Sequence, residues 1–395
     1  MRLNKVYFYF NNIFWLVATC VLAPFFYLCI FFKKRKKRDK KKILVIPPVK
    51  IGDLVCSTHL FREIKKRHPK SHVAVALLVN KSRAKTAYDL IKHNQNIDEI
   101  ITLPGESFSI YNILKLAREL HKKDFDWVFG LNFVAMDRII AFWSCIPNRA
   151  MLNSAYANLT CRFLDFFINY HSEIRLHYFA PQERLRLLRF IGINDFNDLK
   201  TEVFTSQEEE KQADNFLSKN NLSSDDFLIG VALTAGNKIK EWPKDNFIDV
   251  ANKLIEKYKA KIIFIGGPRD KDDIDYVRSR IKKKTFDTSR DLSLIELAAL
   301  MRNMNIFISV DTGPLYLANA MGVSVVNIAG PIDVNEQPPL GDKCEIVQKK
   351  LSCVPCSYVI KTARFCKRGD LKCVEDTKLE DVLRAVEKLI NKNEK

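Results

Sequence analysis

The stretch that decides the fold runs from Asn305 to Pro331 and reads NIFISVDTGPLYLANAMGVSVVNIAGP. Residues 306–310 form a short apolar run rich in β-branched side chains, whereas apolar residues recur at helical spacing after Gly313-Pro314. A second apolar run, residues 323–328, is followed by Gly330-Pro331. The pattern predicts a strand, a short helix and a second strand. Such a unit is a parallel crossover, with both strand-ending loops at one edge of a sheet.

The turn Asp311-Thr312-Gly313 lies at the edge where ligands bind in open α/β sheets. We expect the amides of Thr312, Gly313 and Leu315 to point out of the helix N-terminus. There the amides and the helix dipole favour a phosphate or pyrophosphate by about 0.3 to 1 kcal/mol per charge. The same residues also fit a structural interpretation, in which Asp311 caps the helix and Gly313-Pro314 makes the turn.

Length and charge distribution limit the possible classes of protein. The 395 residues, 47% hydrophobic and 28% charged, suffice for two globular domains with separate cores. The net charge of +18 is uneven, because residues 1–42 hold 11 Lys and Arg against one Asp and so contribute +10. This distribution favours a membrane surface as a partner. It argues against nucleic acid, since the rest of the chain shows no basic groove with interleaved aromatic residues.

Residues 13–32 are 20 consecutive uncharged, mostly apolar residues, which make about 30 Å of helix. The basic run Lys33–Lys42 follows directly, without a small-residue cleavage site, and this order disfavours a cleaved signal peptide. We predict a membrane anchor that spans the bilayer or, given Pro24 within the run, lies at its interface as a kinked helix. By the positive-inside rule the basic run stays cytoplasmic, which places the rest of the chain on the cytoplasmic side of the inner membrane.

The first domain is predicted over residues 43–215, after the anchor and basic run of residues 1–42. Apolar runs predict strands at residues 43–46, 73–79, 100–103 and 127–131. Apolar residues at helical spacing predict helices at residues 54–67 and 110–120. Strands that alternate with helices indicate a parallel, doubly wound sheet. The polar run 207–226 marks the boundary.

The second domain is predicted over residues 216–395 and repeats the scheme. Strands are expected at 227–233 and 262–265, ahead of the stretch quoted above. Ser293 and Glu296 form the capping-box pattern of the helix before that stretch. The fold class is therefore α/β with two doubly wound sheets, which are expected to face each other across a cleft.

Four motifs then carry a resemblance to a known family. They are Lys50-Ile51-Gly52-Asp53, Lys240-Glu241-Trp242-Pro243, Gly266-Gly267-Pro268 and the stretch from Asp311 to Ala318. In this order and spacing they resemble glycosyltransferase family 9, the ADP-heptose:lipopolysaccharide heptosyltransferases, over about residues 43–390. The resemblance implies a GT-B fold of two Rossmann-like domains, with the acceptor on the N-terminal domain and the nucleotide sugar on the C-terminal one. It also implies inverting transfer of a heptose or related sugar to a lipopolysaccharide core or other lipid-linked saccharide, with no metal or other cofactor in catalysis.

The resemblance assigns catalytic roles to two residues. Asp53 stands at the position of the catalytic base, and a positioned carboxylate that takes the acceptor proton is worth on the order of 10² to 10⁴ in rate. Lys240 matches the lysine that neutralises the donor diphosphate and the charge growing on the leaving group. The structural alternatives are a helix cap for Asp53 and a solvated loop lysine for Lys240. Lys50 and Gly52 are assigned to the acceptor side.

Donor binding is assigned to the strand-ending loops of the second domain. The residues are Thr234, Gly236, Lys240, Gly266, Gly267, Asp311, Thr312, Gly313 and Tyr316. Trp242-Pro243 is expected to pack its loop and not to touch ligand. Tyr316 departs from the family, whose members usually carry a histidine there. A phenol donates one hydrogen bond and stays neutral near pH 7, whereas imidazole can carry a charge.

Four of the ten cysteines cluster as Cys353, Cys356, Cys366 and Cys373. In a cytoplasmic protein such spacing favours zinc over disulfides, although the two intervals do not match a zinc-knuckle pair. We predict a structural role, with zinc as a possible ligand.

Two other function classes stay open. A sugar-nucleotide epimerase shares this two-sheet layout and would release an altered sugar without any acceptor. A degenerate homologue that only binds nucleotide or glycan would hold the donor without turnover, and Tyr316 in place of histidine makes it credible.

Overall fold

The computed structural model describes residues 2–33, 40–104, 108–196, 198–223 and 225–393. The chain forms two compact units, one of Met1–Val49 with Ser57–Leu199 and the other of Lys50–Cys56 with Lys200–Lys395. This division differs from the predicted boundary after residue 215. The polar run begins with a helix that packs in the second unit, so the units divide after Leu199. The short segment Lys50–Cys56, which carries Gly52 and Asp53, also belongs to the second unit.

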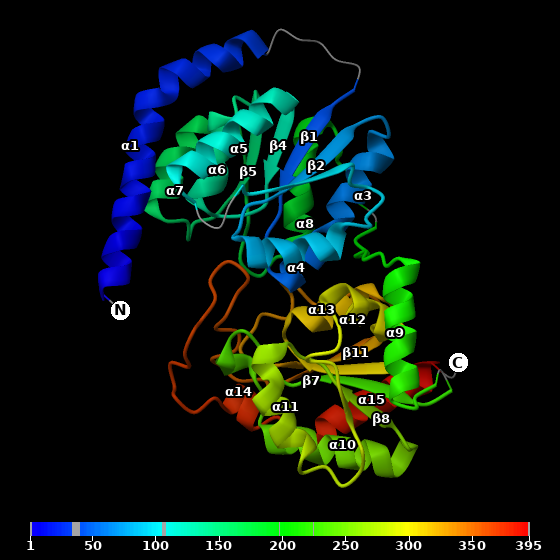
Figure 1. Ribbon diagram of the computed structural model, residues 1–395. Coiled ribbons are helices and arrows are strands. Elements are labelled where there is room, and N and C mark those ends of the chain that lie inside the picture. The colour runs from blue at the N-terminus through cyan, green and yellow to red at the C-terminus, as the bar shows by residue number, and fades with distance from the viewer. Residues whose placement is uncertain (1, 34–39, 105–107, 197, 224, 394–395) are drawn as a thin grey trace. The chain divides into compact units, whose positions relative to one another are not determined.

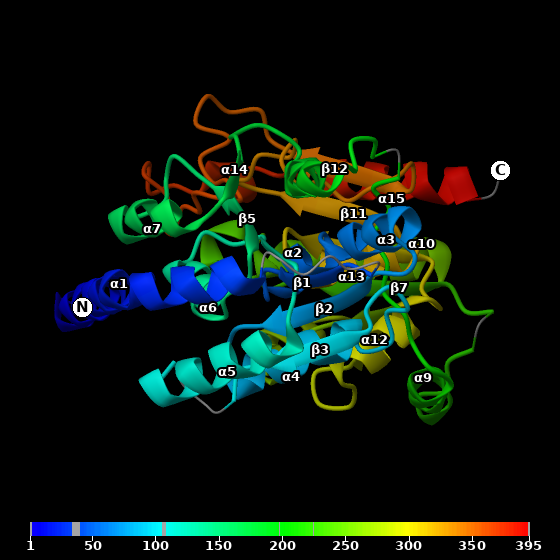
Figure 2. The same ribbon diagram turned by 90° about the horizontal axis from the view of Figure 1, so that it is seen from above.

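The first unit is built on a six-stranded sheet in which every neighbouring pair is parallel, in the order β3-β2-β1-β4-β5-β6. Figure 2 shows β1, β2 and β3 side by side. Strands β1, β2 and β4 are buried along nearly their whole length because helices cover both faces of the sheet, whereas the edge strand β6 is mainly polar. Their bounds are β1 Lys42–Ile46, β2 His72–Leu77, β3 Glu99–Thr102, β4 Trp127–Gly130, β5 Asn148–Asn153 and β6 Tyr170–Glu173.

Helices of the first unit follow most of these strands (Figure 1). The helix predicted over residues 54–67 is in fact two helices, α2 and α3, which break at Cys56-Ser57. The helices of this unit are α1 Arg2–Lys33, α3 Thr58–Arg67, α4 Lys81–Ile91, α5 Ile110–Lys123, α6 Ala135–Trp143, α7 Leu159–Leu164 and α8 Ala180–Leu185, with 3-10 turns η1 Asp165–Phe167 and η2 Arg186–Ile191.

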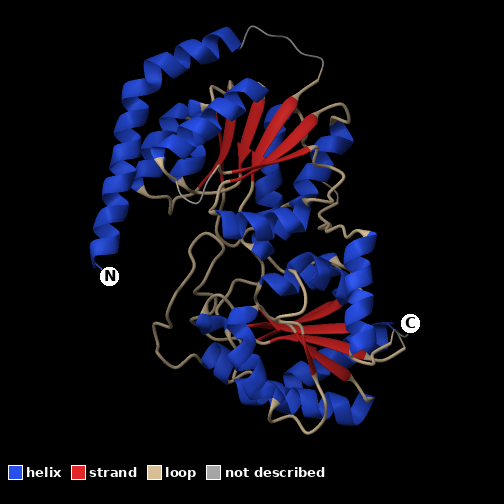
Figure 3. Cartoon of the chain, in the orientation of Figure 1, coloured by secondary structure: helices blue, strands red, loops and turns tan. Residues whose placement is uncertain are grey.

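The second unit repeats the architecture with a parallel sheet in the order β12-β11-β10-β7-β8-β9. Figure 3 shows the strands of each sheet flanked by helices. The predicted α/β class with two doubly wound sheets is confirmed. The strand bounds are β7 Leu228–Ala232, β8 Lys261–Phe264, β9 Phe286–Asp287, β10 Ile306–Val310, β11 Ser324–Ala329 and β12 Cys344–Gln348.

Among the helices of the second unit, α12 begins with the predicted capping box, in which the Ser293 hydroxyl accepts a hydrogen bond from the Glu296 amide. Helix α9 packs on α12, and Arg302 forms an ion pair with Glu210 at 2.9 Å, which explains why α9 lies in this unit. The bounds are α2 Ile51–Val55, α9 Gln207–Lys219, α10 Lys244–Tyr258, α11 Lys271–Arg278, α12 Leu294–Met301, α13 Gly313–Ala320, α14 Lys372–Glu375 and α15 Leu379–Asn393, with η3 Lys238–Lys240 and η4 Pro268–Asp270.

Helix α1 packs against α6 and α7 of the first unit. Within the part of the chain that the structure describes, its segment Ile13–Lys33 is the one helix long and apolar enough to cross a membrane. Only 28% of that apolar window is buried. Length and composition alone do not separate a membrane helix from a helix of the fold, so the contacts of α1 decide its role.

Candidate active site

The centre of the candidate site lies where the strand order of the second sheet reverses, between β7 and β10. Because these two strands are parallel, the loops that follow them emerge at the same edge, which is the usual ligand site of a doubly wound sheet. Lys240 comes from the loop after β7 and Asp311 directly follows β10. Lys240 Nζ donates to Asp311 Oδ2 at 2.5 Å, and the side chains are 19% and 8% exposed. Lys240 is therefore held in place and is not an ordinary solvated loop lysine.

Tyr316, in α13, contacts the second carboxylate oxygen of Asp311 and so extends the network of Lys240 and Asp311. Its hydroxyl lies 2.6 Å from Asp311 Oδ1 and 2.8 Å from the carbonyl oxygen of Gln337, so two acceptors share one phenolic proton. Burial, followed by the nearby Asp311 carboxylate, raises the pKa of Tyr316 well above its ordinary value. The phenol therefore stays a neutral donor, and it orients Asp311 against Lys240.

The α2 turn, which carries Asp53, packs directly on the start of α13. A Cβ atom placed on Gly52 would lie 2.8 Å from Tyr316 Cδ2, and one placed on Gly313 would lie 2.8 Å from Ile51 Cβ. The two glycines thus permit a backbone approach that any side chain would obstruct. The negative charge of Asp53 contributes to the raised pKa of Tyr316, so the two side chains share one electrostatic environment.

The helix-cap interpretations of Asp53 and Asp311 do not match the observed helix ends. The N-cap of α2 is Lys50 and that of α13 is Thr312, and neither cap makes a side-chain hydrogen bond to its helix. Asp53 lies in the first turn of α2 and is half-buried. The Asp311 carboxylate is directed to Lys240 and Tyr316 instead.

The N-terminus of α13 only partly matches the predicted phosphate-binding turn. The Leu315 amide donates to the Thr312 carbonyl at 3.2 Å, so it is used within the turn and does not point outward as predicted. Pro314 has no N–H. Thr312 and Gly313 remain at the positive end of the helix dipole, beside the Lys240 and Asp311 pair.

The other predicted donor residues fall into two groups. Thr234 is buried beside the Lys240 loop, which is closed by a 2.8 Å hydrogen bond from the Ala235 amide to Glu241 Oε1, and the space beside Gly236 is open. The Gly267 amide donates to Asp270 Oδ2 at 2.7 Å, so this amide closes its own turn. Gly266 is packed tightly against Asp270 and Ile274.

Two further predictions concern the flanks of the motifs. Trp242 is 1% exposed, and its indole N–H donates to the Thr377 carbonyl at 3.0 Å, so it packs its loop as predicted. Lys50 is exposed, and its carbonyl accepts from the Leu54 amide at 2.8 Å at the start of α2. Its side chain is therefore accessible beside the Asp53 turn.

Comparison with known proteins identifies the family to which this chain belongs. The sequence profile of glycosyltransferase family 9 (heptosyltransferase) matches residues 113–364, more than half of the chain. The chain belongs to glycosyltransferase family 9. It is 23% identical over 332 residues to lipopolysaccharide heptosyltransferase 2 of Salmonella typhimurium (strain LT2), covering 77% of this chain and 87% of the relative.

Solved structures of family 9 glycosyltransferases share the fold. A family 9 glycosyltransferase from Veillonella parvula has a TM-score of 0.77 at 24% identity, over 90% of this chain and 99% of its own. The E. coli ADP-heptose lps heptosyltransferase II has a TM-score of 0.70 at 18% identity, over 90% and 100% of the two chains. At these identities the structures support the GT-B fold of this glycosyltransferase, and the sequence match supports the family.

Sequence reasoning missed a buried polar group in the first unit of this glycosyltransferase. Asn132 follows β4, and its amide nitrogen donates to the Pro47 carbonyl at 3.0 Å and to Asp137 Oδ2 at 2.9 Å. Burial raises the pKa of Asp137 to about 7, against the opposing hydrogen bond from Asn132. The signal was a polar residue directly after a predicted strand, at the carboxyl edge where ligands bind.

A buried histidine of the same unit was also missed. Burial lowers the pKa of His59 to about 3, so its imidazole is neutral, and Nε2 lies 3.3 Å from the Pro181 carbonyl. An isolated histidine on the buried side of an amphipathic helix gives no sequence signal that separates packing from function.

The four clustered cysteines are free thiols in this family member. Among the described residues no group of three or more His, Cys, Asp or Glu side chains is arranged to hold a metal ion. The thiols nevertheless influence one another. The pKa of Cys373 is raised to about 11, first by burial and then by Cys356, Cys366 and Cys353. In contrast, backbone N–H groups, with that of Leu371 first, lower the pKa of Cys366.

Proposed function

We propose that this glycosyltransferase moves a heptose from ADP-heptose, with inversion and without a catalytic metal, to a lipopolysaccharide core or related lipid-linked glycan. The observation that carries the proposal is the network of Lys240, Asp311 and Tyr316, with the Asp53 turn packed against it. Family membership supports the reaction class. The names of the Salmonella and E. coli relatives support heptose, ADP and lipopolysaccharide as the chemistry of the substrates.

Asp53 would act as the general base. A sugar acceptor attacks through a hydroxyl that must lose its proton as the new bond forms, and an aspartate at the mouth of a strand-ending turn can take that proton. Direct displacement at the anomeric carbon from the face opposite the diphosphate gives inversion. The close packing of α2 on α13 would fix the distance between Asp53 and the proposed donor-binding turn Thr312-Gly313.

Lys240 would bind the donor diphosphate and stabilise the charge that develops on the departing ADP. A preorganised cation in a largely buried position is more effective than a mobile one, because no reorganisation is needed during the reaction. The Asp311 carboxylate and the Tyr316 hydroxyl would hold Lys240 in position. Thr312 and Gly313, at the positive end of α13, would add favourable dipole interactions with the phosphates.

The test separates chemistry from binding. Asp53→Asn keeps the side-chain size and removes the base, so we expect sugar transfer to fall by about 10² or more while ADP-heptose binding is unchanged. Transfer would be measured to a lipid-linked core acceptor and binding by calorimetry. Parent-level transfer by Asp53→Asn would show that Asp53 is not the base.

Lys240→Ala is the complementary variant. Loss of a charge-assisted contact of about 1.5 to 3 kcal/mol should weaken ADP-heptose binding by roughly tenfold to a hundredfold and reduce transfer at least as much. Added chelator should change neither quantity. Release of an altered sugar without acceptor would favour an epimerase. Donor binding without turnover, even with cell-derived acceptor lipid, would favour a binding-only homologue.

We also propose the location of the reaction. A lipid-linked acceptor and the apolar α1 segment support a location in the cell envelope, at the inner membrane, with both units in the cytoplasm. The basic run Lys33–Lys42 supports that orientation.

A further inference from the structure

Helix α1 has two apolar faces with different surroundings. One face buries Trp15, Thr19, Ala23, Phe26 and Ile30, which recur every three or four residues. The opposite face exposes large apolar side chains at the same spacing, namely Phe14, Val17, Val21, Phe25, Leu28 and Phe32. A helix that is apolar all round needs an apolar environment on both sides, and the protein supplies only one of them.

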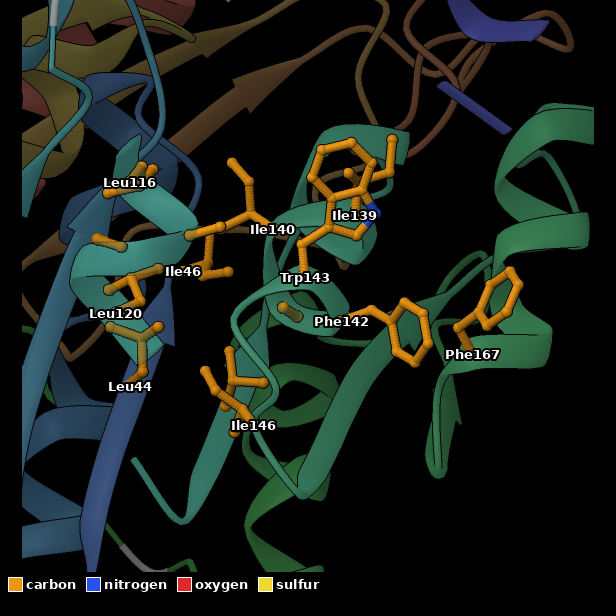
Figure 4. Packing of buried hydrophobic residues seen from close by; sticks show 14 of the residues in the cluster. Leu44, Ile46, Leu116, Leu120, Ile139, Ile140, Phe142, Trp143, Ile146 and Phe167 are labelled. Carbon is orange, nitrogen blue, oxygen red and sulfur yellow. The ribbon is translucent and has the colours of Figure 1, made fainter. Parts of the chain in front are cut away.

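The inner face of α1 is part of the core of the first unit. Phe26 stacks on Trp143 with ring centroids 5.7 Å apart, and meets Phe142 edge-on at 5.5 Å. Phe142 in turn packs on Phe167 at 4.6 Å (Figure 4). Phe142, Trp143 and Phe167 are all buried, and α1 contributes directly to the burial of the first two. If α1 left the unit to cross a bilayer, these aromatic side chains would face water.

Polar contacts fix α1 on the unit in the same arrangement. In the middle of the helix the Trp143 indole N–H donates to the Thr19 hydroxyl at 3.1 Å, which itself donates to the Trp15 carbonyl at 2.7 Å. At the C-terminal end Lys33 Nζ donates to the His121 carbonyl at 3.1 Å and lies 3.4 Å from Asp124. These contacts connect α1 to α6 and to the end of α5, as expected for a docked helix.

The exposed apolar surface continues onto α7 and η1, which adjoin α1 in the fold. Leu159, Phe163 and Phe166 are exposed there, Phe166 by 80%. Helices α1 and α7 are in contact, and Figures 1 and 2 show both on the outer side of the first unit. We call the outer residues of α1 with these three the apolar face.

We propose that α1 is an interfacial helix, docked on the first unit by its inner side, and that the apolar face binds the surface of an anionic bilayer. Charge favours lipid over a second copy of the chain. Nine of the ten residues in Lys33–Lys42 are basic, so two copies joined at this face would bring like charges together, whereas anionic headgroups complement them. The proposal does not depend on which sugar the enzyme transfers.

The first test is flotation of the full-length protein with vesicles of phosphatidylcholine alone or mixed with phosphatidylglycerol. Val21 and Phe25 are 72% and 63% exposed, so Val21→Glu/Phe25→Glu should keep the parent's melting temperature but lose vesicle binding at least tenfold. The matched control, Ile346→Glu/Phe365→Glu, adds the same charges at exposed apolar sites of the second unit and should float like the parent. Parent binding should increase with the anionic lipid. Undiminished flotation of the Val21/Phe25 variant would overturn the proposal.

The second test separates a docked helix from a spanning one. With a cleavable tag before Met1, protease added to the cytoplasmic face of membrane vesicles should remove the tag, because an interfacial helix keeps its N-terminus on that side. A protected tag means that α1 spans, and overturns the proposal. Phe26→Ala should lower the melting temperature of the protein, as expected only if α1 is part of the folded unit. A parent protein that ignores vesicles but forms dimers broken by Val21→Glu/Phe25→Glu would assign the face to a second copy instead.

Discussion

Tyr316 is the residue on which the arrangement of the site depends most directly. Its ring lies against Gly52, and its hydroxyl contacts Asp311 and the Gln337 carbonyl. Since burial, followed by Asp311, raises the pKa of Tyr316 well above its ordinary value, the phenol stays protonated near pH 7 and donates a hydrogen bond. A neutral donor here satisfies Asp311 without adding charge, so Lys240 remains the positive group of this network.

This arrangement predicts different results for two substitutions of Tyr316. Tyr316→Phe keeps the ring and leaves Asp311 Oδ1 without the phenolic donor, which should cost about 1.5 to 3 kcal/mol and lower transfer by roughly tenfold to a hundredfold. Tyr316→His introduces the residue that the resemblance to the family predicts there and keeps a donor, so its loss should be smaller. The measurement is kcat and KM for sugar transfer with each variant. Equal rates for Tyr316→Phe and the parent would mean that the phenol only fills space.

At the scale of elements, α2 packs closely on α13. The close approach is possible because a glycine stands at each contact point. Gly313→Ala would place a Cβ 2.8 Å from Ile51 Cβ, which is branched and close to the backbone, so the α2 turn has to move. A shift of about 1 Å can cost on the order of 10² in rate, and we expect transfer to fall accordingly. If Gly313→Ala keeps full transfer, the packing of α2 on α13 does not position Asp53.

The same elements show what the sequence could and could not predict. Most central strands and the loops after them were predictable, because fully buried parallel strands read as continuous apolar runs and the motifs stand where those runs end. Strands β5, β6, β9 and β12 were not predicted. The Lys240–Asp311 pair was not, because it joins residues 71 positions apart and periodicity describes only local structure. The sequence also did not predict that Lys50–Cys56 packs in the second unit. That packing depends on the contact of Gly52 and Gly313 between distant parts of the chain, which local periodicity does not describe.

At the scale of the whole molecule, α1 was recognised from its length and apolar composition, but its inner face was not. A helix that is apolar all round carries no sequence signal that distinguishes a protein neighbour from lipid. The partners Trp143 and Phe142 lie more than 100 residues away. The contacts that decide between spanning and docking are therefore visible only in the folded chain.

The segment between β12 and α14 raises a final question about stability. In this stretch of more than 20 residues the described structure has an isolated bridge at Ser357 but no helix or strand, and so long an irregular segment is costly in entropy unless something ties it down. Three of the four clustered cysteines lie in it, and the fourth lies in α14. The amides of Cys356 and Ser357 already tie the segment to the Pro331 carbonyl, each at 3.0 Å. A structural metal would provide a further tie, although the described thiols are not arranged as a metal site.

We therefore propose a structural zinc ion that draws these thiols together, and its consequences are measurable. Purified protein should contain about one equivalent of zinc, and Cys353→Ser/Cys356→Ser should lose the metal and lower the melting temperature, because metal binding favours the folded state. Cys344→Ser is the control, since Cys344 contacts Leu340 and Asn319 outside the cluster. Sugar transfer per folded molecule should be the same with and without the metal, because in the proposed mechanism Lys240 and α13 bind the diphosphate. Metal-free protein with unchanged stability in the double variant would leave the cysteines a packing or redox role only.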